Sequence, residues 1–214
     1  MKTHPILFNT EMVQAILQGR KTQTRRVIKA NIPEKAKFIG CRESKEEGVG
    51  FYFSDGTTGN MQGFYPSLFG NLYCPYGQVG DILWVRESFS KKKDTVVYRA
   101  NVCSKWDLPD GFSWKPSIHM PKDVARIFLK IKDVRIERLF DISEIDSQME
   151  GVSFEIVNKI KEYKDYLNPK HTFPVYAKLS FISLWEKING EKSLELNPWV
   201  WVVEFERIEK PKNF

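Results

Sequence analysis

A lysine and a threonine lie three residues apart in a strongly basic segment near the start of the chain, residues 19–26. If the chain keeps a helix-like turn there, Lys21 and Thr24 face the same side. A neutral lysine amine can take the proton of a neighbouring hydroxyl, and the resulting alkoxide can attack a carbonyl, as in serine–lysine catalysis. Nearby arginines lower the pKa of the amine, which is the direction this chemistry needs. The same pair also fits a surface turn without chemistry.

The positive charge of the chain is concentrated in its first segment. The formal net charge is +6 over 214 residues. Residues 1–40 hold eight basic and two acidic side chains, and the remainder of the chain is balanced. A focused positive field attracts polyanions, most often nucleic acid, although a solvated basic surface fits the composition as well. The candidates for phosphate contacts in this segment are Arg20, Arg25, Arg26 and Lys29.

Three residues further along the chain are additional candidates for a nucleic-acid surface. Arg86 ends an apolar stretch with strand character, so its side chain could face a cleft or form an ion pair at a sheet rim. Trp114 and His119 lie in a proline-flanked loop, where a base could stack or a phosphate bind, although a loop without a ligand fits equally. The histidines and cysteines show no metal-ligand spacing, so neither a metal nor a cofactor is expected.

The elements that must position these residues are predicted from hydrophobic periodicity and turn residues. Strands are expected near residues 5–8, 82–87, 95–99, 125–139 and 199–205. Helices are expected near residues 10–18, 144–150, 157–163 and 179–189. The stretch 125–139 fits one long bent strand or two strands broken near Asp133, and turns with short hairpins are expected over residues 40–80. Separated strands with few helices indicate an α+β fold with a small, partly closed barrel.

Composition and cysteine usage indicate an ordinary globular protein of the cytoplasm. Hydrophobic residues make up 42% of the chain and charged residues 28%. No apolar run approaches the roughly 18 residues of a membrane helix, and no signal peptide is recognised, so no membrane partner is expected. Three cysteines are an odd count, which argues against a disulfide scaffold and favours a reducing compartment. The sequence carries no signal for the oligomeric state.

The basic segment also resembles that of a known family. The pattern Gly19-x-Lys21-x-x-x-x-Arg26 after a short helix is similar to the signature of ASCH domains, whose fold resembles the RNA-binding PUA domain. Similar segments, some of them typical of longer bacterial and phage or prophage members, extend over nearly the whole chain at residues 80–87, 114–121, 141–144, 150–151 and 197–201. The resemblance implies one PUA-like domain over residues 1–214, a small mixed β-barrel with short peripheral helices. It also implies insertions at about 40–80 and 152–196.

The residue at position 24 distinguishes branches of this family. The usual ASCH signature has glutamate there, whereas this chain has Thr24 and resembles a compact branch that hydrolyses the amide of N4-acetylcytidine. By position, the catalytic set proposed for that branch corresponds to Lys21, Thr24 and Glu150, with the glutamate in the helix after the central strands. The compact branch lacks much of what lies at residues 40–80 and 155–196 here.

The resemblance leaves three functions open, all with RNA or a modified nucleoside as the expected partner. The first is binding together with amidohydrolase chemistry at Lys21, Thr24 and Glu150. The second is a non-catalytic RNA-binding module whose basic side chains contact phosphates. The third is ribonuclease action in the same basic cleft, where Lys21 would stabilise the phosphorane.

Overall fold

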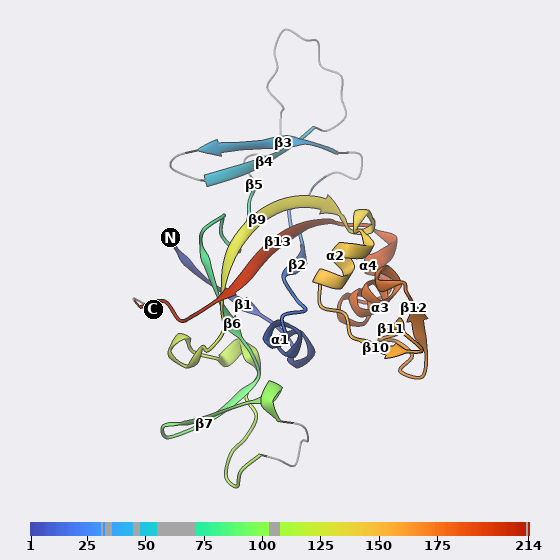
Figure 1. The fold of residues 1–214 in the computed structure, drawn as a ribbon. Helices are drawn as coiled ribbons and strands as arrows, with labels where there is room; N and C mark the ends of the chain where they lie inside the picture. The colour runs from blue at the N-terminus through green and yellow to red at the C-terminus, as the bar shows by residue number, and fades with distance from the viewer. Residues whose placement is uncertain (31, 33–35, 45–47, 55–71, 103–107, 213) are drawn as a thin grey trace, which may run out of the picture.

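The fold is seen in a computed structural model of the chain (Figure 1), which describes residues 1–30, 32, 36–44, 48–54, 72–102, 108–212 and 214. A five-stranded sheet lies at its centre and consists, in spatial order, of β1 (Thr3–Leu7), β6 (Ile82–Arg86), β9 (Phe128–Arg138), β13 (Trp199–Ile208) and β2 (Gln23–Val27). β1 pairs with β6 in parallel, and the other neighbours are antiparallel. β2 is therefore an edge strand of this sheet, and the basic segment of the sequence leads into it.

Smaller sheets and helices surround the central sheet. The additional strands are β3 (Lys37–Ser44), β4 (Gly48–Ser54), β5 (Leu72–Tyr73), β7 (Phe89–Lys92), β8 (Thr95–Tyr98), β10 (Phe154–Val157), β11 (Ile160–Lys164) and β12 (Thr172–Pro174). The helices are α1 (Thr10–Leu17), α2 (Glu144–Met149), α3 (Ala177–Asn189) and α4 (Lys192–Glu195). Short 3-10 turns are η1 (Arg99–Asn101), η2 (Ser117–His119), η3 (Lys122–Val124) and η4 (Leu139–Asp141). Figure 1 shows α2, α3 and α4 gathered with β10–β12 on the side of the sheet that carries β2.

Local side-chain caps start α1, which precedes the basic segment, and α2, which directly precedes Glu150. The Asn9 side-chain oxygen accepts a hydrogen bond from the Met12 amide at 2.8 Å and so caps α1. The Ser143 hydroxyl accepts the Asp146 amide at 3.0 Å and caps α2. Gly19 has a φ of +74° just after α1, a conformation that favours glycine and ends the helix there.

The central strands also confirm the strand that hydrophobic periodicity predicts at residues 125–139. Residues 125–139 contain one strand, β9, and its pairing with β13 shifts register between Glu204 and Phe205, which leaves Lys132 as an extra residue. The predicted break near Asp133 is thus a bulge within one curved strand (Figure 1). The β3–β4 hairpin packs on β13 through edge-to-face rings, with Phe51 against Trp201 at 5.0 Å between ring centroids.

The helix predicted at residues 157–163 is wrong. These residues form the β10–β11 hairpin, whose turn residues Asn158 and Lys159 have φ values of +51° and +67°. Two successive positive φ values are the requirement of a type I′ hairpin turn, which asparagine satisfies without a glycine. Val157 and Ile160, which suggested a helical stripe, are exposed here rather than packed on a core.

The α+β class is confirmed, but the central sheet is open. In the described part of the chain no backbone ladder joins the edge strands β1 and β2, so the expected β-barrel is not closed. None of the helices in the described ranges has the length and apolar character needed to cross a membrane. The division into one domain with two insertions stays a prediction.

Gly151, which follows α2, generates a prediction about stability. Its φ is +86°, and a Cβ added there would lie 2.7 Å from Lys21 Cβ and 2.9 Å from Ala15 Cβ. Gly19 has a similar φ of +74° but nothing within 4 Å of an added Cβ. We expect both glycine-to-alanine variants to lose about 1–2 kcal/mol through backbone strain. Gly151→Ala should lose about 1–3 kcal/mol more through overpacking, measured as the free energy of unfolding in urea. Equal losses in the two variants would show that the close approach at Gly151 is relaxed at no cost.

Candidate functional site

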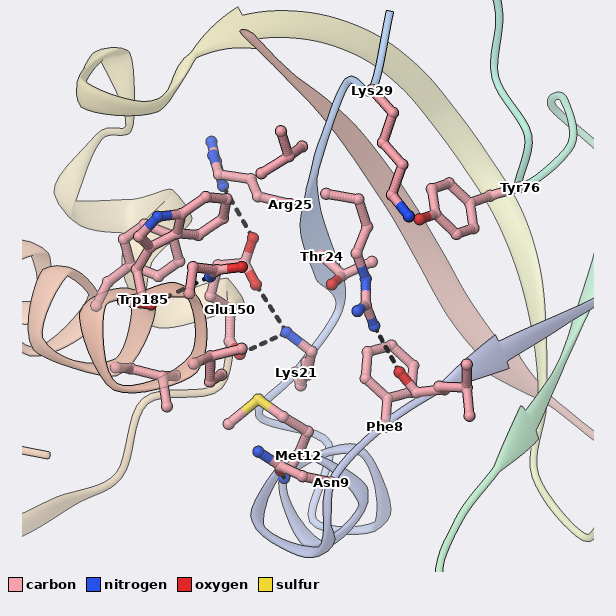
Figure 2. Close-up of a pocket in the computed structure, with 17 residues that line it drawn as sticks. Phe8, Asn9, Met12, Lys21, Thr24, Arg25, Lys29, Tyr76, Glu150 and Trp185 are labelled. Carbon is pink, nitrogen blue, oxygen red and sulfur yellow. Dashed lines mark hydrogen bonds and ion pairs between the residues drawn. The ribbon is translucent and has the colours of Figure 1, made fainter. Parts of the chain in front are cut away.

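A pocket of about 370 Å³ opens beside β2 (Figure 2). Its walls come from four places that are far apart in the sequence: the junction of β1 and α1, the segment from Lys21 to Lys29, Tyr76, and α3. Glu150, directly after α2, completes it. Basic, acidic and hydroxyl groups thus share one concave space with aromatic rings.

Lys21 and Glu150 form a buried ion pair in this pocket. The two residues are 3% and 4% exposed. Lys21 Nζ donates to Glu150 Oε2 at 2.7 Å and to the Glu150 backbone carbonyl at 2.8 Å. The backbones also meet, because Lys21 and Glu150 form an isolated antiparallel bridge and Thr22 N donates to Met149 O at 2.9 Å. Two of the three hydrogen-bonding positions of the amine are therefore filled by Glu150, and within the described chain no other acceptor fills the third.

Burial lowers the pKa of the Lys21 amine below its usual value of 10.5, because the ammonium form loses its hydration there. The Glu150 carboxylate opposes this effect, and the charges of Arg26 and Arg25 add to it. The net direction is downward. The structure thus holds an amine that loses its proton more readily than an exposed lysine, with its free position available to a group in the pocket.

Thr24 supplies the hydroxyl of the predicted pair. It lies on β2 opposite Val203 and is buried. Figure 2 shows its side chain in the middle of the pocket, beside Lys21 and Glu150, and all three residues line the same space. In the described part of the chain no hydrogen bond engages the Thr24 hydroxyl, so the oxygen is available to a ligand. The helix-like turn expected at residues 21–24 is wrong, because Thr24 belongs to a strand, yet both side chains reach the pocket.

Arg25 has a different role from the phosphate contact predicted for it. It is buried, and its guanidinium donates to Glu150 Oε1 at 3.2 Å and to Glu137 Oε2 at 2.8 Å. Asp146 Oδ2 lies 3.6 Å from the same group. Three carboxylates thus hold Arg25 inside the protein. Its partners are more than 100 residues away in the sequence, so no local signal identified them.

The other predicted binding residues fall into separate places. Arg26 and Lys29 line the pocket. Arg20 does not, because its guanidinium donates to Gly151 O at 2.7 Å and Val152 O at 3.1 Å and borders a different hollow. The structure does not bring the remaining predicted residues to the pocket; these are Arg86, Trp114 and His119.

Those three residues have other contacts, near the β7–β8 hairpin. Arg86 donates to the Ile118 backbone carbonyl. The Trp114 ring lies under the guanidinium of Arg99, 5.5 Å from its centroid. His119 borders a shallow hollow next to Lys91, Lys93 and Lys115. Their predicted contact with nucleic acid stays a prediction, separate from the pocket.

Sequence reasoning missed the aromatic and apolar wall of the pocket. Phe8, Phe181 and Trp185 line it, together with Met12 and Tyr76. Hydrophobic periodicity assigns such residues to the core, but it gives no sign that they also line a cavity. Among the described residues no cluster of three or more His, Cys, Asp or Glu side chains is placed to hold a metal ion.

The pair generates a prediction about titration. Glu150→Gln removes the negative charge that supports the ammonium form of Lys21, so the pKa of Lys21 should fall further below 10.5. The measurement is an NMR titration of lysine labelled with carbon-13 at Cε. Glu155→Gln removes an exposed carboxylate of β10 and should reproduce the wild-type midpoint. A higher midpoint in Glu150→Gln would contradict the pairing.

A second prediction concerns the pH dependence of stability. Because the pKa of Lys21 is lower in the folded chain than in the unfolded chain, the unfolded chain binds more protons between the two values. Over that interval, ending near pH 10.5, Lys21 makes the free energy of unfolding rise with pH by at most about 1.4 kcal/mol per unit. Lys21→Met should lose this rise in urea titrations at several pH values. A wild-type stability that falls with pH relative to Lys21→Met would contradict the direction.

The chain was also compared with known proteins. No protein-family model, no curated protein and no solved structure matches it.

Proposed function

We propose that the chain is an ASCH protein with a PUA-like fold that binds a nucleoside unit and hydrolyses an N4-acyl amide of the N4-acetylcytidine type. The observation that carries the proposal is that Lys21, Thr24 and Glu150 line one pocket, with the amine and the carboxylate in direct contact. The three residues are those that the family resemblance selects by position.

The shape and lining of the pocket support a small planar ligand. Its volume of about 370 Å³ falls at the lower end of small-molecule sites, and aromatic rings from Phe8, Phe181 and Trp185 border it. Aromatic side chains stack on nucleobases, which contributes roughly 1–3 kcal/mol per base. A base among these rings would present its exocyclic acyl group to the polar groups on β2.

The proposed reaction begins at Lys21. The neutral amine takes the Thr24 hydroxyl proton, and the threonine oxygen attacks the acyl carbonyl carbon. The new ammonium stabilises the oxyanion of the tetrahedral intermediate. When the intermediate collapses, the bond from carbon to the exocyclic nitrogen breaks, and the nitrogen receives a proton through Lys21 and Glu150. Water then hydrolyses the acyl-threonine ester, which releases acetate and restores the hydroxyl.

Glu150 has two tasks in this scheme. It orients the Lys21 amine by accepting two hydrogen bonds from it, one at its carboxylate and one at its backbone carbonyl. Its carboxylate also stabilises the positive charge of the Lys21 ammonium once the amine has taken the proton of Thr24. Arg25 donates to the other carboxylate oxygen of Glu150 and so holds the carboxylate in place.

The non-catalytic alternative has less support from the same geometry. That alternative needs basic side chains that are free to contact phosphates. Two of the four predicted contacts in the basic segment, Arg20 and Arg25, are engaged by carbonyls and carboxylates of the protein itself, which leaves Arg26 and Lys29 for such contacts. The ribonuclease alternative gains no observation of its own.

The proposal is tested with a pair of matched variants. Thr24→Val removes the pocket hydroxyl at nearly constant volume, and it should reduce release of acetate from N4-acetylcytidine by at least about 10³-fold. Thr22→Val makes the same change two residues earlier, at a side chain that borders a different hollow, and should retain activity. Acetate and cytidine are measured by proton NMR.

Lys21→Met should be as inactive as Thr24→Val, because the two residues act in one step and their losses are not additive. Circular dichroism and the unfolding midpoint show whether each variant is folded. Full turnover by folded Thr24→Val would overturn the mechanism. Absence of turnover by the wild type, with binding of the nucleoside retained, would favour the non-catalytic alternative.

A further inference from the structure

The charges of the pocket are divided between a neutralised floor and an unneutralised mouth. On the floor, Lys21 and Arg25 contact Glu150, and Arg25 has further carboxylate partners outside the pocket. At the mouth, Arg26 and Lys29 have no carboxylate within ion-pair distance in the described part of the chain. The positive charge that this pocket presents to a ligand therefore comes from these two residues.

The guanidinium of Arg26 is only partly used by the protein. One nitrogen, Nη2, donates to the Leu7 backbone carbonyl at 2.6 Å, and the group lies over the Phe8 ring at 5.2 Å from its centroid. Its Nε is buried with no hydrogen-bond partner. A buried N–H without a partner is costly, and a ligand oxygen placed against it would relieve that cost. The contacts with Leu7 and Phe8 hold the group in place before a ligand arrives.

Lys29 and Tyr76 lie at the same side of the pocket. Figure 2 shows both of them across Thr24 from Glu150 and Trp185. Lys29 is exposed, and among the described residues its ammonium has no hydrogen-bond or ion-pair partner. Burial raises the pKa of the Tyr76 hydroxyl, so the group stays protonated and able to donate. Among the described residues, the Nε of Arg26, the ammonium of Lys29 and the hydroxyl of Tyr76 therefore remain as donors at the mouth for which the protein supplies no acceptor.

We propose that Arg26 and Lys29 bind a phosphate of the ligand, so that the pocket takes a phosphorylated nucleoside in preference to a free one. This inference rests on the proposed function, because it assumes that the base lies among the aromatic rings. Guanidinium groups bind phosphate oxygens through charge-assisted hydrogen bonds, and a lysine adds a flexible point charge. The phosphate could belong to a mononucleotide or to the backbone of a short oligonucleotide.

The test is a binding measurement that requires no turnover. Isothermal titration calorimetry compares cytidine, its 5′- and 3′-monophosphates, and a cytidine dinucleotide as ligands of the full chain. The wild type should bind at least one of the monophosphates at least about 10-fold more tightly than cytidine, because a charge-assisted contact is worth about 1.5 kcal/mol or more. A dinucleotide that binds more tightly than both monophosphates identifies a backbone phosphate, whereas equal binding identifies a mononucleotide.

One double variant and one control variant assign the effect to the mouth. Arg26→Gln combined with Lys29→Gln should reduce the preference for the phosphorylated ligand over cytidine to within about 2-fold. Raising the salt concentration should weaken the wild-type affinity for the phosphorylated ligands more than that of this double variant. Lys130→Gln removes an exposed charge on β9, outside the pocket, and should keep the wild-type preference.

The outcomes separate this inference from the proposed function. Equal binding of cytidine and both monophosphates by the wild type would overturn it, and so would a double variant that keeps the preference. Tight binding of a monophosphate without release of acetate from N4-acetylcytidine would support the phosphate site and reject the amide hydrolysis. Absence of binding for every ligand would overturn the phosphate site, and release of acetate from N4-acetylcytidine would then decide on the amide hydrolysis by itself.

Discussion

The buried contact between Lys21 and Glu150 is the interaction on which the pocket depends. Moving an ammonium and a carboxylate out of water costs several kcal/mol for each ion, and their attraction offsets this only with good geometry and additional hydrogen bonds. Both conditions are present, because Lys21 also donates to the Glu150 backbone carbonyl and Arg25 donates to the second carboxylate oxygen. A buried ion pair is weak support for stability, since apolar residues of the same volume often serve as well. Its place at the wall of a pocket therefore favours a chemical role.

A chain of alternating charges holds the Glu150 carboxylate in place. Arg25 connects it to Glu137 on β9 and to Asp146 on α2. Arg135 contacts the same two carboxylates from the other side, at 2.5 Å from Glu137 and 3.5 Å from Asp146. The outer members of this chain are partly exposed, so each contributes less to stability than the buried ones. Their effect is to fix the position of α2 relative to β2, which sets where Glu150 meets Lys21.

The sequence could predict the features that depend on near neighbours. Asn9 and Ser143 cap the helices because their partners lie three residues away. The same local reasoning failed at residues 157–163, where apolar residues at helical spacing also suit a hairpin once Asn158 accepts a positive φ. Local sequence signals do not show which residues pair across the fold. Glu150 was therefore predicted as a site residue only through a family resemblance.

The predicted phosphate contacts on and beside β2 show the same limit more clearly; they are Arg20, Arg25, Arg26 and Lys29. Their composition indicates one basic surface, but their partners differ, and only distant residues decide which charges stay free. Arg25 and Arg26 are adjacent on a strand and point in different directions, as alternation requires. One meets the carboxylates of α2 and β9, and the other meets the Phe8 ring and the Leu7 carbonyl.

The different partners of Arg25 and Arg26 affect how a catalytic base, Lys21, and a phosphate site can share one pocket. Arg26 lowers the pKa of Lys21, and a phosphate bound to Arg26 in the proposed complex would weaken that effect. Burial has the largest influence on the pKa of the Lys21 amine, which is buried before any ligand enters the pocket. The contribution of Arg26 is smaller than that of burial. Neutralising the charge at the mouth therefore leaves in place the main cause of the lowered pKa of Lys21.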